Sequence, residues 1–357
     1  MSDPGLIPGA SILIRNGLME EIGPARRVEN LVGARLAREI DASGKIVMPA
    51  FVDAATTLIH ENSPHRASAN LNTVSKKVVA ARVASASLQC ALQGCLTVGA
   101  RTPAVADLRV ISKVLRAHQA CQARPLRIRS VLALRFPQAY QAPALADLLS
   151  HLLHSVHDRK LATVVELDLA DPNLAAAALA AAGLGFTLRF RSASPPGAAA
   201  RQLALEAGAI SLLAPADPAP GLSTALAAAG CVRIYPAREV VDPSPSSAAN
   251  VRRAISAGTA IALASDASRG DPSPCSLFSL LNLAVTRFGL TIEEAITATT
   301  WNPACALRLA QSAGCLEAGR LADLLILDVP DYRDLALPPD PSTLSLVMRA
   351  GHIVQRH

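Results

Sequence analysis

The chain has 357 residues, of which 51% are hydrophobic and 17% are charged, and its formal net charge is +6. This composition excludes a disordered chain, and we expect no membrane association because the longest apolar stretch, residues 174–186, is shorter than the roughly 18 residues of a membrane-spanning helix. The basic residues are dispersed and only 3% of the chain is aromatic, which argues against a nucleic-acid partner and leaves a basic surface that can attract an anionic ligand.

The first elements are predicted to be strands. Residues 11–15 and 18–22 flank Asn16-Gly17, a pair that favours the positive φ angles of a type I′ turn, so we expect a β-hairpin. A second extended pair is expected around the turn at residues 42–44, leading into a strand at residues 47–49.

From about residue 70, helical stretches rich in alanine and leucine alternate with short apolar strands. This rhythm predicts βαβ units and a parallel sheet. The strands are expected at residues 95–98, 128–134, 163–167, 186–190, 209–213, 231–235 and 261–264. Together with the strand before them they number roughly eight, and no Gly-x-Gly-x-x-Gly turn is present. The fold class is therefore predicted to be a (β/α)8 TIM-type barrel rather than an open dinucleotide-binding sheet.

Several helix signals stand out. Thr291 and Glu294 have the spacing of a capping box, in which each side chain satisfies a backbone N–H of the first turn. Asn302-Pro303 is expected to cap the helix that follows. Three histidines at helical spacing are expected on the solvent side of an outer helix: His151, His154 and His157.

Strand patterns return near the C-terminus, at residues 322–328 and 344–354. Because strands lie near both ends of the chain, we predict one small composite domain, a β-sandwich, formed by residues 1–50 and 314–357. The barrel is then expected to occupy residues 51–313.

The cysteines and the first residues bear on the cellular compartment. The chain has seven cysteines without a Cys-x-x-Cys pair, which is typical of reduced thiols. The N-terminal residues lack the basic start and apolar stretch of a secretory signal. We therefore expect a cytoplasmic protein.

Segments near both ends carry a family resemblance. They are Ile14-Arg-Asn-Gly17, residues 40–49, Phe51-Val-Asp53, residues 314–319 and residues 322–334. In these segments the chain resembles the amidohydrolase superfamily and, more narrowly, the imidazolonepropionases. The resemblance implies a metal-dependent barrel, with zinc or iron as the divalent metal, that hydrolyses a C–N amide bond in a ring.

In such enzymes, histidines at the ends of strands one and five and an aspartate at the end of strand eight hold the metal. The positions of the family's active-site histidines carry other residues here: Ala55, Thr57, Leu134, Arg189 and Ala214. Only the strand-eight aspartate is kept, as Asp266, which we interpret as a vestigial catalytic residue. An alanine methyl has no lone pair and a guanidinium cannot ligate a cation, so we predict no metal site and no metal cofactor in this chain.

Charged residues at the predicted strand ends allow two interpretations. Arg189 can pair with Asp266, or with an anionic ligand, in the space of the missing metal; the alternative is an exposed arginine on the barrel rim. Glu166 and Asp168 point the same way along a strand. They are either paired acids at the barrel mouth or polar residues of the rim.

Two histidines follow the degenerate motif in a loop expected at the catalytic face. His60 and His65 can converge on a replacement metal site, or they are solvated loop residues. Together with Thr57, Arg189 and Ser268 they complete the predicted substrate pocket.

The sequence thus predicts an imidazolonepropionase-like protein that has lost its metal-ligand histidines. We expect it to be inactive in the hydrolysis of cyclic C–N amide bonds and to act as a ligand-binding or partner subunit for a small molecule, with a homodimer as an expected assembly. The alternative is an active hydrolase of cyclic amide C–N bonds with an atypical or absent metal site. A third option is a folded chain without a selected activity.

Overall fold

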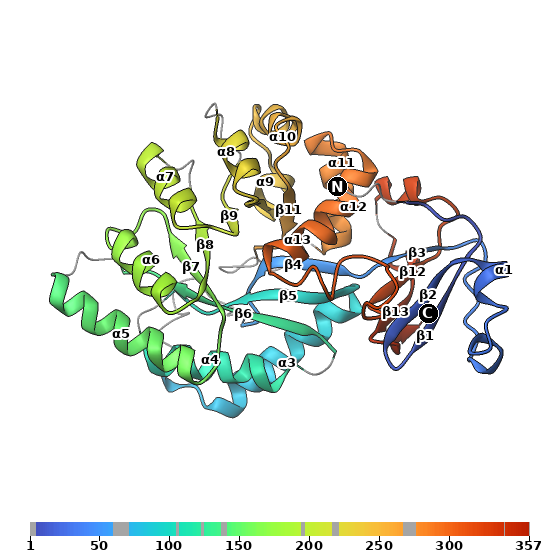
Figure 1. The fold of residues 1–357 in the computed structure, drawn as a ribbon, viewed down its shortest axis with the longest axis horizontal. Coiled ribbons are helices and arrows are strands. Elements are labelled where there is room, and N and C mark those ends of the chain that lie inside the picture. The colour runs from blue at the N-terminus through green and yellow to red at the C-terminus, as the bar shows by residue number, and fades with distance from the viewer. Residues whose placement is uncertain are drawn as a thin grey trace.

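An eight-stranded parallel sheet, curled into a barrel, forms the centre of the molecule (Figure 1). The computed structural model describes residues 5–59, 71–104, 107–122, 125–136, 141–193, 197–215, 221–266, 276–338 and 340–356. The barrel strands follow one another in chain order: β4 (Phe51–Thr56), β5 (Cys95–Arg101), β6 (Arg127–Leu134), β7 (Val164–Asp168), β8 (Thr187–Arg191), β9 (Ser211–Leu213), β10 (Val232–Pro236) and β11 (Ile261–Ala264). The predicted (β/α)8 barrel is confirmed.

Helices cover the outside of the barrel (Figure 1). They are α3 (Lys76–Leu92), α4 (Leu108–Ala120), α5 (Ala142–Asp158), α6 (Leu174–Gly183), α7 (Ala198–Glu206), α8 (Leu222–Ala228), α9 (Ala237–Val241), α10 (Ser247–Ser256), α11 (Leu277–Phe288), α12 (Ile292–Thr299) and α13 (Trp301–Ala306). In α4, Val110, Ile111, Val114 and Leu115 form one buried face at helical spacing, which is the pattern that packs a helix against a sheet. Among the described residues, no helix is long and apolar enough to cross a membrane.

One of the two predicted helix caps is confirmed and the other is wrong. Thr291 and Glu294 form the predicted capping box at the start of α12. The expectation for Asn302 is wrong, because the residue preceding α13 is Thr300 and Asn302 lies within the helix. Its side-chain amide instead donates to the Ile261 carbonyl of β11 at 2.7 Å, which fastens α13 to the barrel.

Two smaller sheets lie beside the barrel, where Figure 1 shows the first and last segments of the chain side by side. The first is the predicted hairpin of β1 (Ala10–Arg15) and β2 (Leu18–Pro24), followed by the short helix α1 (Ala25–Val28). Asn16 and Gly17 have φ angles of 53° and 81°, as a type I′ turn requires.

The second small sheet has the order β14-β13-β12-β3 and contains β3 (Ile46–Pro49), β12 (Leu324–Leu327), β13 (Leu344–Arg349) and β14 (His352–Arg356). The extended pair expected around residues 42–44 is wrong, because no strand precedes that turn and β3 pairs with β12 instead. The strand expected at 344–354 is split by a turn at Ala350 and Gly351, both at positive φ.

The two small sheets pack on each other through Met19, Leu324, Ile326, Leu346 and Met348, all of them buried. The division into a composite domain of residues 1–50 and 314–357 and a barrel of residues 51–313 stays a prediction.

A buried carboxylate connects the barrel to the four-stranded sheet. Asp323, just before β12, accepts from Arg127 of β6 at 3.2 Å, from Arg349 of β13 at 3.5 Å and from the Ala350 N–H at 2.8 Å. The Arg349 guanidinium also donates to the Pro125 carbonyl at 3.1 Å. One side chain therefore satisfies donors from both parts of the molecule.

We expect Asp323→Ala to lower the free energy of unfolding by about 3 kcal/mol, because it leaves Arg127 and Arg349 without their carboxylate in a largely buried place. The measurement is urea denaturation of the full chain. As a control, Asp328→Ala removes an exposed carboxylate that pairs with Lys45 and is expected to change stability by less than about 1 kcal/mol. Equal losses in the two variants would contradict this role of Asp323.

Candidate functional site

Five charged side chains converge at the carboxyl ends of the barrel strands. Arg101 ends β5, Glu166 lies in β7, Arg189 and Arg191 lie in β8, and Asp266 follows β11. In a parallel barrel all these strand ends open at the same face, where barrel enzymes carry their active sites. We call these five residues the mouth cluster.

Arg189 is the most deeply placed member of the mouth cluster, with 0% of its surface exposed. Its guanidinium lies 2.5 Å from the Glu166 carboxylate and donates to the Ala54 carbonyl, also at 2.5 Å. Ala54 lies where the register between β4 and β5 shifts, between Asp53 and Thr56. Glu166 and Arg189 are direct neighbours in the ladder of β7 and β8, so their side chains meet at the same height in the barrel.

Asp266 neutralises the other arginines. Its carboxylate forms an ion pair with Arg101 and a second, at 3.5 Å, with Arg191. Arg101 also reaches Glu166 at 3.5 Å, so it crosses the barrel interior between the two carboxylates. Burial disfavours the charge on Arg101, but Asp266 and Glu166 outweigh that effect and raise the pKa of Arg101. Three guanidinium groups thus face two carboxylates.

The backbone at Asp266 also closes the barrel. The Asp266 N–H donates to the Ala55 carbonyl of β4 at 2.9 Å, which joins the last strand end to the first. Asp266 has a φ of 40°, a left-handed conformation that aspartate adopts more readily than most residues.

Asp53 forms a second tie between the first and last strands. It is 4% exposed and accepts hydrogen bonds from the Ser265 hydroxyl at 2.5 Å, the Ser265 N–H at 3.2 Å and the Ala55 N–H at 3.1 Å. Burial raises the pKa of Asp53 to about 6, although the hydrogen bonds from Ser265 and Ala55 favour the charged form. A carboxyl with this pKa titrates in mildly acidic solution.

The positions of Arg189 and Asp266 differ from those predicted from the sequence. Arg189 is fully buried, so the interpretation as an exposed rim arginine is wrong. Its ion-pair partner is Glu166, whereas Asp266 pairs with Arg101 and Arg191. The expected Arg189–Asp266 pair is therefore replaced by a cluster in which both belong to one charge network.

The acids in β7 take separate roles. Glu166 belongs to the mouth cluster, whereas Asp168 lies 3.7 Å from Arg135, a half-exposed side chain. The two acids therefore do not act as a pair, since Glu166 binds Arg101 and Arg189 whereas Asp168 binds Arg135.

The other predicted positions carry no charge. Ala55, Leu134 and Ala214 are buried in apolar surroundings. The Thr57 hydroxyl accepts from the Ile59 N–H at 3.5 Å. His60, His65 and Ser268 lie outside the described residues.

Sequence reasoning did not find Arg101 or Arg191. Arg101 ends the largely apolar strand Cys95–Arg101, and Arg191 ends Thr187–Arg191, two residues after Arg189. This signal was available, because a charged residue that ends an apolar barrel strand lies at the face where barrel sites are built.

The described residues do not fit a divalent metal. Within these ranges, no three His, Cys, Asp or Glu side chains come together as a ligand set. The carboxylates of Glu166 and Asp266 are held by guanidinium groups, which would repel a cation. The Nε atoms of Arg101 and Arg189 are buried without an acceptor among the described residues. Such orphan donors suit an anion, a carbonyl or a water rather than a metal ion.

We expect Glu166→Gln to lower the free energy of unfolding by about 3–5 kcal/mol, because the buried charges of Arg101 and Arg189 lose a partner. The double variant Glu166→Met with Arg189→Met should lose less free energy of unfolding than the Glu166→Met and Arg189→Met single variants lose together, since an apolar pair needs no charge compensation. Chemical denaturation of the single and double variants measures this coupling. Asp168→Asn, on the same strand, is the control and should change little; additive losses would contradict the coupling.

Asp53 should make stability depend on pH. Its pKa of about 6 in the folded chain lies above the ordinary aspartate value of 3.8, so the folded state binds the proton more tightly. The contribution of Asp53 to stability is therefore greatest at acidic pH and is lost as pH rises from about 4 to about 6, by up to about 3 kcal/mol. Asparagine does not titrate, so the Asp53→Asn variant should not show this loss. Its free energy of unfolding should therefore rise relative to that of the parent chain as pH increases over this interval, as measured by denaturation at several pH values. Parallel pH profiles would contradict this assignment.

Comparison with known proteins identifies the family. The model of the Amidohydrolase family matches residues 162–354, more than half of the chain. The imidazolonepropionase of Brevibacillus brevis is 28% identical over an alignment that covers 99% of this chain and 92% of that protein. That alignment has 396 positions, more than the 357 residues present here, so the relative contains stretches that this chain lacks. The imidazolonepropionase of Rubrobacter xylanophilus is 41% identical over 29% of this chain and 25% of its own length.

Solved structures share the fold. N-isopropylammelide isopropylaminohydrolase from Burkholderia multivorans has a TM-score of 0.74 and 18% identity, covering 97% of this chain and 95% of that chain. Molinate hydrolase has a TM-score of 0.71 and 17% identity, covering 97% of this chain and 90% of that chain. Family match, sequence relatives and fold agree, and the chain belongs to the amidohydrolase family as an imidazolonepropionase-like member.

Proposed function

We propose that this imidazolonepropionase-like barrel has lost its metal-ligand histidines, does not hydrolyse cyclic C–N amide bonds, and serves as a ligand-binding or partner subunit. The observation that carries the proposal is the complete burial of Arg189 between Glu166 and the Ala54 carbonyl. A fixed positive charge occupies the part of the barrel mouth where the family resemblance calls for a metal-binding histidine.

The state of Asp266 supports the same proposal. In a metal-dependent hydrolase a carboxylate near the metal removes a proton from water. Here Asp266 is held by Arg101 and Arg191, and accepting a proton would weaken both ion pairs. A carboxylate held by two guanidinium groups is not free to bind and orient a water molecule for attack.

The remaining charge favours an anionic ligand at the mouth. Arg191 is the most exposed of the three arginines in the mouth cluster, with a quarter of its side chain open. It can contact a ligand without leaving Asp266, whose main partner is Arg101. A small carboxylate fits this arrangement, because guanidinium groups bind carboxylates with paired hydrogen bonds.

A second candidate function is hydrolysis of a cyclic amide. The match to imidazolonepropionases along nearly the whole chain favours it. This function would rely on Asp266, together with either a replacement metal site at His60 and His65 or no metal at all.

Metal content separates the two candidates. We expect full-length, untagged protein expressed with zinc, iron and manganese to carry far less than one metal ion per chain by elemental mass spectrometry. It should also show no metal-stimulated turnover of an imidazolone substrate. Near-stoichiometric metal, or turnover that Asp266→Asn abolishes, would overturn the proposal and favour the hydrolase.

A rebuilt variant is the matched control. Ala55→His, Thr57→His and Arg189→His together restore most of the expected ligand set, because neutral imidazole is the commonest metal ligand. We expect partial metal uptake by this variant under the same expression conditions. Metal in both the variant and the parent at equal amounts would mean that the metal lies elsewhere and that Arg189 does not decide its binding.

A further inference from the structure

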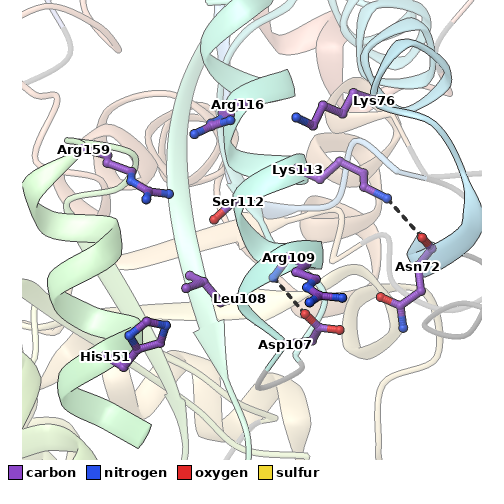
Figure 2. Close-up of a pocket in the computed structure, with 10 residues that line it drawn as sticks. All are labelled: Asn72, Lys76, Asp107, Leu108, Arg109, Ser112, Lys113, Arg116, His151 and Arg159. Carbon is purple, nitrogen blue, oxygen red and sulfur yellow. Dashed lines mark hydrogen bonds between the residues drawn. The ribbon is translucent and has the colours of Figure 1, made fainter. Parts of the chain in front are cut away.

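A basic groove lies along helix α4 on the outer layer of the barrel, and none of its lining residues belongs to the mouth cluster. Its volume is about 680 Å³, within the roughly 300–1,000 Å³ typical of small-molecule sites. Helix α4 contributes most of the lining, α3 contributes Lys76, α5 contributes His151, and Arg159 directly follows α5 (Figure 2). The lining residues are Asn72, Lys76, Asp107, Leu108, Arg109, Ser112, Lys113, Arg116, His151 and Arg159.

The groove has a surplus of positive charge. Five of its lining residues are lysine or arginine and one, Asp107, is acidic. The Asp107 carboxylate is already used as the cap of α4, where it accepts from the Arg109 N–H at 2.8 Å and the Val110 N–H at 3.4 Å. In the described ranges of the chain, no carboxylate forms an ion pair with Lys76, Arg109, Arg116 or Arg159. In the mouth cluster, by contrast, every arginine has a carboxylate partner.

One lysine is held in place by the backbone. The Lys113 ammonium donates to the carbonyls of Leu71 at 2.7 Å, Val74 at 2.8 Å and Asn72 at 3.5 Å. These contacts use its three donors, so Lys113 contributes a fixed positive field rather than a direct ligand contact. Its position is defined before any ligand arrives.

The free cations follow the length of the groove. Arg109, Ser112 and Arg116 lie on one face of α4, and seven residues from Arg109 to Arg116 correspond to about 10 Å of helix. Figure 2 shows Arg116 and Arg159 on facing sides of the groove, at the end away from Asp107. A ligand that meets these side chains together must be elongated and carry several negative charges.

We propose that this groove binds a small polyanion that carries a chain of phosphoryl groups. Planar guanidinium groups match the oxygens of phosphate, and the unpaired arginines at both ends of α4's exposed face provide them without displacing a carboxylate. Apart from the imidazole of His151, the lining contains no ring, so the groove offers no stacking platform for the bases of a nucleic acid. The recognised chemistry is the phosphoryl chain itself.

The test is isothermal titration calorimetry of the full chain with inorganic tripolyphosphate at low salt. We expect saturable binding with one site per chain, and affinity that falls as salt is raised, because exposed charges are screened. Arg116→Gln with Arg159→Gln should weaken binding about tenfold or more, since each substitution removes a charge-assisted hydrogen bond. Both arginines are exposed, so the fold should tolerate these changes.

The control is Arg35→Gln with Arg38→Gln, which removes the same charge from two exposed positions in the N-terminal segment. This variant should bind tripolyphosphate as the parent chain does. A nucleoside triphosphate should bind with an affinity similar to that of tripolyphosphate, because the groove recognises the phosphoryl chain alone. Absence of saturable binding, equal weakening in both double variants, or a strong preference for single-stranded RNA would overturn the proposal.

Discussion

A charged arginine that is closed off from water must find a partner, and the mouth of this barrel is organised around that constraint. Moving a charge from water into a protein interior costs several kcal/mol unless ion pairs and hydrogen bonds compensate it. Arg189 has no exposed surface, and Glu166 on the neighbouring strand meets it in register. Arg101 then shares Glu166 and requires Asp266. The mouth cluster therefore extends from β5 to the residue after β11, and in it each buried charge is compensated by a neighbour of opposite sign.

The same residues also join the ends of the barrel. The backbone of Asp266 bonds to β4 while its side chain holds Arg101, and Asp53 of β4 binds Ser265 beside it. The residues that close the barrel are therefore in part the same residues that compensate the buried charges. Among the described residues, ion pairs and a backbone hydrogen bond connect the strand ends at this face of the barrel.

Sequence patterns predicted the order of the elements well and their partners poorly. The positions of the barrel strands and the hairpin turn at Asn16-Gly17 follow from local chemistry, which a single segment contains. The partner of Arg189 depends on the register between β7 and β8, and the role of Arg101 depends on a contact across the barrel interior. Neither is encoded in local spacing, because both arise from how distant strands are aligned. Likewise, the turn that divides residues 344–354 into two strands depends on a positive φ at Ala350, a conformation that alanine rarely adopts.

The basic residues of the mouth cluster and those of the outer groove differ in how far their charge is compensated. In the mouth cluster, the arginines are buried against carboxylates, so their field is largely cancelled at short range and salt has little access to it. In the outer groove, Arg109 and Arg116 of α4 and Arg159 after α5 are exposed without a carboxylate partner among the described residues, and their field extends to about the screening length of the solution. The mouth cluster keeps one positive charge more than its two carboxylates compensate, and among the described residues the Nε atoms of Arg101 and Arg189 have no acceptor.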